Sequence, residues 1–93
     1  MPDFEIRYHE NVADDLEKIP KSIKKRIATA INNRLAVAPE QYGRKLQRTL
    51  AGLWKIRVGD YRIVYEISGK TITVWGVRHR KNIYPKVEKR IDS

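Results

Sequence analysis

The sequence predicts an α+β domain in which an antiparallel β-sheet of about four strands carries two N-terminal helices on one face, in the order β-α-α-β-β-β. Three patterns support this prediction. Polar and apolar residues alternate over residues 4–8 and on both sides of a two-residue turn at 59–60. Apolar residues recur every three or four positions over residues 23–35, as in an amphipathic helix. The length of 93 residues fits a single domain, residues 1–93.

The N-terminal half is predicted to form one strand followed by two helices. Residues 4–8 are the strand, because their side chains alternate between apolar and polar. Asn11 is suited to the N-cap of a short first helix, which Pro20 interrupts. Ser22 is suited to the N-cap of the longer second helix, and Pro39 ends that helix.

The C-terminal half is predicted to form the rest of the sheet. Residues 45–47 add a short strand or a turn. Gly59-Asp60 predicts a tight hairpin turn, because glycine at the first central position tolerates a positive φ. Residues 71–77 are β-branched and aromatic and form a further strand, which a short basic segment follows. The hairpin register pairs Val58 with Tyr61, Arg57 with Arg62, and Ile56 with Ile63.

The alternation of side chains gives this hairpin one apolar and one cationic face. The apolar face, assigned to the core, consists of Trp54, Ile56, Val58, Tyr61, Ile63 and Tyr65. The cationic face carries Lys55, Arg57 and Arg62, together with Val64. Like charges that lie opposite each other destabilise a sheet. The cationic face is therefore expected to bind an anionic ligand that offsets the repulsion.

The net charge of +9 lies entirely in the half that contains the hairpin. Residues 41–93 hold thirteen Lys and Arg against four Asp and Glu, whereas residues 1–40 hold seven of each kind. An excess confined to one half and aligned on a strand face indicates a polyanionic ligand, such as nucleic acid, or an acidic protein partner.

Composition also excludes several classes of function. The chain has no cysteine and two histidines, so neither a disulfide nor a thiolate or histidine metal site is expected, and no cofactor is expected. No apolar run approaches the length of a membrane span, and no signal-peptide pattern opens the sequence. We therefore expect a cytoplasmic protein.

Cations close to a phenol and an imidazole suit the cleavage of RNA by its own 2′-hydroxyl. That reaction needs a base for the 2′-hydroxyl, an acid for the leaving 5′-oxygen and positive charge for the phosphorane. Adjacent cations favour the phenolate form of a tyrosine, so Tyr84 is a candidate base, with a cation or His79 as acid. The segment after the last strand leaves the sheet beside the hairpin and contains Arg78, His79, Arg80 and Tyr84.

Three motifs occur together in this half: Gly-x-Lys-Leu at 43–46, Trp-Lys-Ile-Arg-Val-Gly-Asp-Tyr-Arg-Ile-Val-Tyr at 54–65 and His-Arg-x-x-x-Tyr at 79–84. In combination they resemble the RelE/ParE superfamily of toxins from bacterial type II toxin–antitoxin modules, and the resemblance covers nearly the whole chain. It implies a RelE-like toxin domain that cleaves mRNA in the decoding site of the ribosome and so inhibits translation. It also implies an acidic antitoxin that wraps the toxin and covers its basic surface.

The resemblance carries over to individual residues. It implies catalytic roles for Lys55 and Arg57 before the turn, for Arg62 after it, and for Tyr84. Arg78 and Arg80 both match the later arginine of the family, and Arg80 is taken as the catalytic candidate. Five further residues of this half are assigned to RNA binding: Lys45, Arg48, Arg78, His79 and Lys81.

Two other functions are compatible with these features. The ParE branch acts on DNA gyrase with the same fold but commonly lacks the full set of cations and tyrosine, which favours the ribonuclease. A non-catalytic RNA-binding module requires charge alone. Structural roles for single residues also stay open: Arg62 paired with Asp60 or Glu66, Arg80 paired with Glu88 or Asp92, and Tyr84 in ordinary packing.

Overall fold

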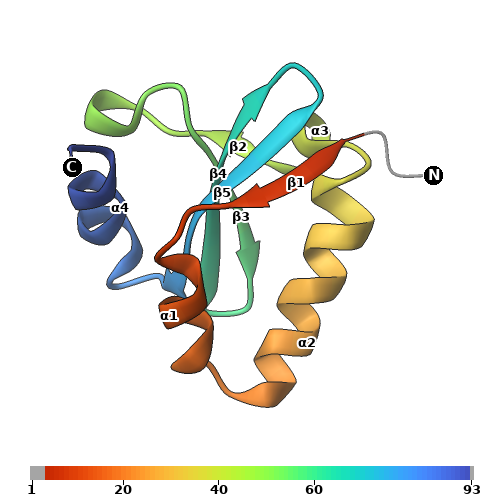
Figure 1. Cartoon of the computed structure of the whole chain (residues 1–93), viewed down its shortest axis with the longest axis vertical. Helices are drawn as coiled ribbons and strands as arrows, with labels where there is room; N and C mark the ends of the chain where they lie inside the picture. The colour runs from red at the N-terminus through yellow and green to blue at the C-terminus, as the bar shows by residue number, and fades with distance from the viewer. Residues whose placement is uncertain (1–3, 93) are drawn as a thin grey trace.

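A computed structural model of the chain describes residues 4–92 and contains a five-stranded sheet in the order β1-β5-β4-β3-β2 (Figure 1). The strands are β1 (Glu5–Tyr8), β2 (Arg44–Lys45), β3 (Trp54–Val58), β4 (Tyr61–Ser68) and β5 (Thr71–His79). The helical segments are α1 (Val12–Glu17), α2 (Lys21–Ala30), the π-helical turn η1 (Ile31–Leu35), α3 (Pro39–Tyr42), the 3₁₀ turn η2 (Arg48–Leu50) and α4 (Ile83–Asp92). The predicted α+β class is confirmed.

The sheet is mixed, because β1 pairs with β5 in parallel while all other neighbours are antiparallel. The prediction of a purely antiparallel sheet was wrong for this outer strand. The strands β1 and β5 are joined by most of the chain, and a long connection that includes helices permits parallel pairing. The local sequence pattern predicts that residues form a strand, but it does not predict which distant strand will pair with it or in which direction.

The predicted hairpin register is confirmed at each position. Gly59 adopts a φ of 61°, as the first central residue of a type II′ turn does, so glycine is favoured there. The turn joins β3 to β4, and directly opposite residues are Val58 and Tyr61, Arg57 and Arg62, Ile56 and Ile63, Lys55 and Val64, Trp54 and Tyr65.

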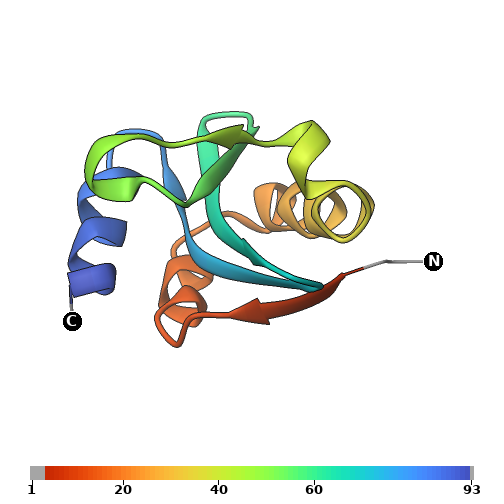
Figure 2. The same cartoon turned by 90° about the horizontal axis from the view of Figure 1, so that it is seen from above.

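Each face of the sheet covers an apolar cluster. The larger cluster lies under α1 and α2 and includes the predicted apolar face of the hairpin, with Ile56, Val58, Ile63 and Tyr65 buried. The smaller cluster lies under α4 and the segment around η2, where Leu50 and Val64 are buried. Figure 2 shows α4 and α2 on opposite sides of the sheet. The two faces of the hairpin therefore meet different layers of the protein.

The helix boundaries correct two sequence-based details and confirm a third. Pro20, rather than Ser22, occupies the N-cap of α2. Pro39 begins α3 instead of only ending the preceding helix, because proline is well suited to the first position of a helix. Asn11 occupies the N-cap of α1, as predicted, although its side chain makes no capping hydrogen bond. Within residues 4–92, no helix is long and apolar enough to cross a bilayer.

The C-terminal segment, predicted to be short and basic, is the ten-residue helix α4. Ile83 and Val87, one turn apart, are buried against β4 and β5. Gly76 of β5 permits the close approach, because a Cβ at that position would lie 3.0 Å from Val87 Cγ2 and 3.1 Å from Ile83 Cδ1. Proline at the third helical position and the high charge of this segment obscured the apolar spacing in the sequence.

Candidate active site

A row of three arginines crosses the sheet on the face that α4 partly covers. Arg57 of β3 lies opposite Arg62 of β4, and Arg62 lies opposite Arg78 of β5. In the next row, Arg44 of β2 lies opposite Lys55. Directly opposite residues project to the same face of a sheet. Lys55, Arg57 and Arg62 were predicted to lie on one face of the hairpin, and the structure places them on one face of the sheet.

A hollow of about 340 Å³ gathers most of these cations. Of the residues that the structure describes, four arginines, one lysine and one phenol line it, and no carboxylate does. Its lining residues are Arg34, Tyr42, Arg44, Lys55, Ile56, Arg57 and Arg62. Such a lining favours an anion, because several positive charges are held together without a fixed counter-charge.

Three residues of this hollow were missed from the sequence: Arg34, Tyr42 and Arg44. Arg44 lies next to Lys55 because β2 pairs with β3, and the short segment around it gave no register for that pairing. Arg34 comes from η1, with its guanidinium carbon 5.8 Å from the centre of the Tyr42 ring. The chain runs from η1 through α3 to the edge of the sheet and brings Arg34 and Tyr42 there. No local sequence pattern predicts this course of the chain.

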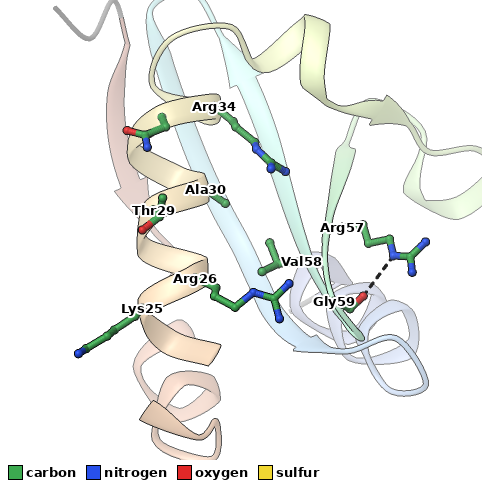
Figure 3. Close-up of a pocket in the computed structure, with 9 residues that line it drawn as sticks. Lys25, Arg26, Thr29, Ala30, Arg34, Arg57, Val58 and Gly59 are labelled. Atoms are coloured by element: carbon green, nitrogen blue, oxygen red, sulfur yellow. Dashed lines mark hydrogen bonds between the residues drawn. The ribbon is translucent and has the colours of Figure 1, made fainter. Parts of the chain in front are cut away.

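A second groove, of about 410 Å³, runs between α2 and the edge of β3 and shares Arg34 and Arg57 with the first hollow. Figure 3 shows Arg34 and Arg26 projecting from the helical side toward β3, with Arg57 on the other side of the groove. Within the described part of the chain, no carboxylate lines this groove either. The cationic surface therefore continues around the edge of the sheet as far as α2. Lys25 and Arg26 of that helix belong to it, because both line the groove.

The hairpin arginines are held by carbonyl oxygens and not by carboxylates. Arg62 Nη1 donates to the Gly59 and Tyr61 carbonyls, at 3.0 Å each, and Arg57 Nε donates to the Gly59 carbonyl at 3.3 Å (Figure 3). The alternative in which Arg62 pairs with Asp60 or Glu66 is not what the structure shows. A guanidinium has five N–H donors, so each side chain is oriented by the turn while its charge stays uncompensated.

Tyr84 lies at the border between the smaller apolar cluster and the cationic face. It is partly buried in the first turn of α4, and Lys55 Nζ lies 5.7 Å from the centre of its ring. Tyr65, in contrast, is fully buried on the other face, where its hydroxyl donates to the Pro39 carbonyl at 2.7 Å and burial raises its pKa. Tyr84 therefore lies beside a hairpin cation, Lys55, as expected, whereas Tyr65 is a packing residue.

His79 and Lys45 lie on the opposite face of the sheet from the hairpin cations. His79 is opposite Tyr61, and the two rings meet edge to face at 5.7 Å. Lys45 is opposite Trp54, with its Nζ 5.5 Å from the centre of that ring. The expectation that His79 approaches the cationic face was wrong, because it adjoins Arg78 in a strand and neighbouring side chains point to opposite faces.

Arg80 and Arg48 are also placed by the structure. Arg80 lies beside the hairpin turn, where its N–H donates to the Asp60 carbonyl at 2.8 Å and its Nε lies 4.0 Å from Asp60 Oδ1. Arg80 therefore pairs with Asp60 instead of Glu88, whose carboxylate accepts a hydrogen bond from Thr49 at 2.9 Å, and the side chain of Asp92 lies outside the described residues. Arg48 is exposed in η2 with a positive φ of 60°.

A buried ion cluster, which the sequence did not reveal, joins α1, β5 and α4. The Asp15 carboxylate has no exposed surface, and both terminal nitrogens of Arg90 donate to it, at 2.7 and 2.8 Å. Arg78 Nη1 also donates to Asp15, at 3.1 Å. Burial alone would raise the pKa of Asp15, but the hydrogen bonds from Arg90, Val77 and Arg78 and the charge of Arg90 outweigh it and lower that pKa.

This cluster takes the place of a neighbouring strand. The strand β1 pairs with β5 only as far as Val74, so among residues 4–92 no strand lies beside the later part of β5 on the side away from β4. There the Val77 N–H donates to Asp15 Oδ2 at 3.1 Å, and Arg90 Nη1 donates to the Trp75 carbonyl at 2.9 Å. Buried backbone groups need such partners. The cluster therefore closes the sheet edge and fixes α4 against β5.

Comparison with known proteins identifies the family. A family model described as "ParE toxin of type II toxin-antitoxin system, parDE" matches residues 6–84. The chain belongs to this toxin family. The toxin is 33% identical over 86 residues to Toxin RelG of Mycobacterium tuberculosis, covering 90% of this chain and 98% of the relative. It is 32% identical to Toxin RelE3 of Methanocaldococcus jannaschii, covering 87% and 96%.

A solved structure shows the same fold. The RelBE2 toxin–antitoxin complex of Mycobacterium tuberculosis contains a chain that superposes on the toxin with a TM-score of 0.78 at 30% identity, covering 86% of this chain and 100% of that one. The toxin is therefore a member of the RelE/ParE family of type II toxin–antitoxin systems with a RelE-like fold, as the sequence motifs indicated. Among residues 4–92, no group of His, Asp and Glu side chains is arranged to hold a metal ion.

Proposed function

We propose that this toxin is a ribosome-dependent endoribonuclease that cleaves mRNA in the decoding site and so inhibits translation. The observation that carries the proposal is the hollow in which Lys55, Arg57 and Arg62 converge without a carboxylate, with Tyr84 beside Lys55. A scissile phosphodiester needs this combination of fixed positive charge and a group that exchanges protons. The kinship with RelE-named toxins supports the same activity.

The geometry supports specific roles. Arg57 and Arg62 hold the non-bridging phosphate oxygens, because guanidinium binds phosphate in a bidentate manner. Tyr84 takes the proton of the 2′-hydroxyl, whose oxygen attacks phosphorus. The bond from phosphorus to the 5′-oxygen breaks, which leaves a 2′,3′-cyclic phosphate and a 5′-hydroxyl. Lys55 supplies the proton to that 5′-oxygen, since an arginine does not give up its proton and His79 lies on the other face.

The catalytic assignment of the later arginine remains a proposal. Arg78 stands in the same row as Arg57 and Arg62, but one of its terminal nitrogens is engaged with Asp15. Arg80 lies beside the turn and is largely exposed. We retain Arg80 as a phosphate-binding candidate next to the hairpin, and we place Arg78 in RNA binding.

We further propose that a cognate acidic antitoxin inhibits the toxin by covering its basic surface. A related solved structure is a toxin–antitoxin complex. The net charge of +9 and the two carboxylate-free hollows on adjoining surfaces would attract an acidic segment. Such a segment would compete with mRNA for the same cations in the cytoplasm, where the ribosomes translate.

Brief expression of the toxin in bacteria, followed by mapping of transcript 5′ ends, tests the nuclease. We expect new 5′-hydroxyl ends within translated reading frames and none when ribosome initiation is blocked. The Arg62→Ala toxin, expressed to the same level, is the matched control and should give no such ends. Intact transcripts during growth arrest by the unmodified toxin would contradict the proposal.

Inhibition of DNA gyrase is the second candidate, because the matching family model describes a ParE toxin. In that case, induction should relax plasmid supercoiling and damage DNA while protein synthesis continues. Pulse labelling of protein in the first minutes after induction distinguishes the two functions. An immediate fall in labelling with normal supercoiling favours the nuclease, and the reverse favours gyrase.

A further inference from the structure

A separate basic hollow of about 240 Å³ lies where β5 meets the start of α4. Among the described residues, four of its six lining residues are cations, one is an amide and none is a carboxylate. They are Arg78, Lys81, Asn82, Pro85, Lys86 and Lys89. The four cations come from three neighbouring segments, the end of β5, the turn after it and α4, so the fold, and not a run of sequence, gathers them.

The surrounding electrostatics increase the positive potential of this hollow. The first turn of α4 contains no acidic residue, although the N-terminal end of a helix carries partial positive charge and is usually complemented by Asp or Glu. Lys81 and Lys86 are exposed on either side of that turn. Like charges held this close repel one another, and a bound anion would remove the repulsion.

Arg78 links this hollow to the candidate active site. It lies directly opposite Arg62 in the β4–β5 ladder, where Cα atoms of paired residues are about 4.5–5.5 Å apart. Its Nη1 is held by Asp15 at 3.1 Å, and 17% of its side-chain surface is exposed. The guanidinium is therefore fixed in place and still presents part of its surface to a ligand. An anionic chain bound at Arg62 would reach Arg78 as its next cation.

We propose that this α4 hollow, formed by the six residues above, is a second phosphate site that holds the RNA backbone next to the scissile position. The inference rests on the proposed function only in taking RNA as the ligand. Phosphate contacts need charge and hydrogen-bond donors and little apolar surface. A stable site for an acidic protein would also need apolar or aromatic anchors, and Pro85 is the single apolar residue in the lining. RNA is therefore the better match.

Binding of a single-stranded RNA whose 2′-positions are methylated tests this site. Such RNA lacks the attacking hydroxyl, so the assay reports binding even if the toxin is not a nuclease. We expect Lys86→Gln with Lys89→Gln to weaken binding and to reduce the slope of log affinity against log salt by about 1.4, at about 0.7 for each phosphate that is no longer neutralised. The control, Lys21→Gln with Lys70→Gln, removes the same charge from exposed positions outside the hollow and should leave that slope unchanged.

Backbone amide NMR during the same titration locates the binding site. Saturable shifts of Asn82, Tyr84 and Lys86 that disappear in the Lys86→Gln, Lys89→Gln toxin support the site. Shifts confined to the β3–β4 hairpin, or equal salt slopes in the double variant and its control, would overturn it. Binding at α4 together with uncleaved mRNA on translating ribosomes would support the second site and refute the nuclease, so the two proposals fail separately.

Discussion

Two groups of arginines in this toxin have opposite surroundings. Arg57 and Arg62 on the hairpin are oriented by backbone carbonyls and line a hollow without carboxylates. Arg90 and, in part, Arg78 are neutralised by the buried Asp15, and Arg90 is 7% exposed. The first group keeps its charge available at the surface, whereas the charge of the second is cancelled by a counter-ion in the interior.

This difference indicates that an arginine's hydrogen-bond partner, more than its presence in a motif, decides whether it binds a ligand or stabilises the fold. A carbonyl orients a guanidinium without cancelling its charge, so the side chain still binds phosphate. A buried carboxylate cancels that charge and converts the same side chain into a structural contact. The two groups should therefore respond differently to substitution: the hairpin group through activity, the cluster through stability.

The largest effect is expected at the hairpin face. Tyr84→Phe removes the proposed base and should lower single-turnover cleavage of mRNA on ribosomes by about 10²–10⁴-fold. Arg62→Ala removes a charge that stabilises the transition state and should cost about 10²–10³-fold. Thermal unfolding of both proteins, measured in parallel, checks that they are folded.

Tyr42→Phe is the matched variant for Tyr84→Phe, because Tyr42 is a phenol that lines the hollow but lies on α3 and packs with Arg34, whereas Tyr84 lies beside Lys55. We expect it to retain cleavage within about tenfold, less than the loss of a general base. If Tyr42→Phe abolished cleavage and Tyr84→Phe did not, the base would be Tyr42 and the role given to Tyr84 would be wrong.

The next effect concerns the ion cluster. Asp15→Asn removes the buried carboxylate that Arg90 and Arg78 share, which should lower the free energy of unfolding by about 3–5 kcal/mol. Urea unfolding at neutral pH measures this change. Asp14→Asn, at the adjacent exposed position of α1, is the control and should change stability by about 0.5 kcal/mol or less. Equal effects of the two substitutions would show that the cluster contributes no special stability.

The same cluster predicts a pH dependence. The pKa of Asp15 is lowered in the folded protein, so its stabilising contribution is complete above the unfolded value of about 3.9 and is lost as the pH falls through the folded value. The stability difference between the unmodified toxin and Asp15→Asn should therefore shrink below about pH 4. Unfolding titrations at several acidic pH values measure it, and a constant difference down to pH 2 would exclude this linkage.

The smallest effect is expected for the cation on the opposite face of the sheet. Lys45→Ala should change cleavage by no more than about twofold, the rate equivalent of roughly 0.5 kcal/mol. Lys55→Ala, of the same residue type on the neighbouring strand, should reduce cleavage by about 10²-fold or more. Comparable reductions in both variants would mean that RNA binds to both faces.

The sequence was sufficient for the features that depend on neighbours in the chain. The Gly59-Asp60 turn and the alternation around it predicted the hairpin register, and with it the shared face of Lys55, Arg57 and Arg62. The helical spacing of residues 23–35 predicted α2 and η1. These features follow from local backbone preferences and from the spacing of the apolar residues. Both can be read from the sequence alone.

Features that require distant segments to meet were decided only by the tertiary structure. The buried Asp15 looked like an ordinary residue in the first turn of a helix, yet it pairs with Arg90, 75 positions away. Arg34 and Tyr42 reached the hollow through the path of η1 and α3. The charge pattern of a sequence shows how many cations exist, but whether each meets a carboxylate, a carbonyl or an open hollow depends on packing across the whole chain.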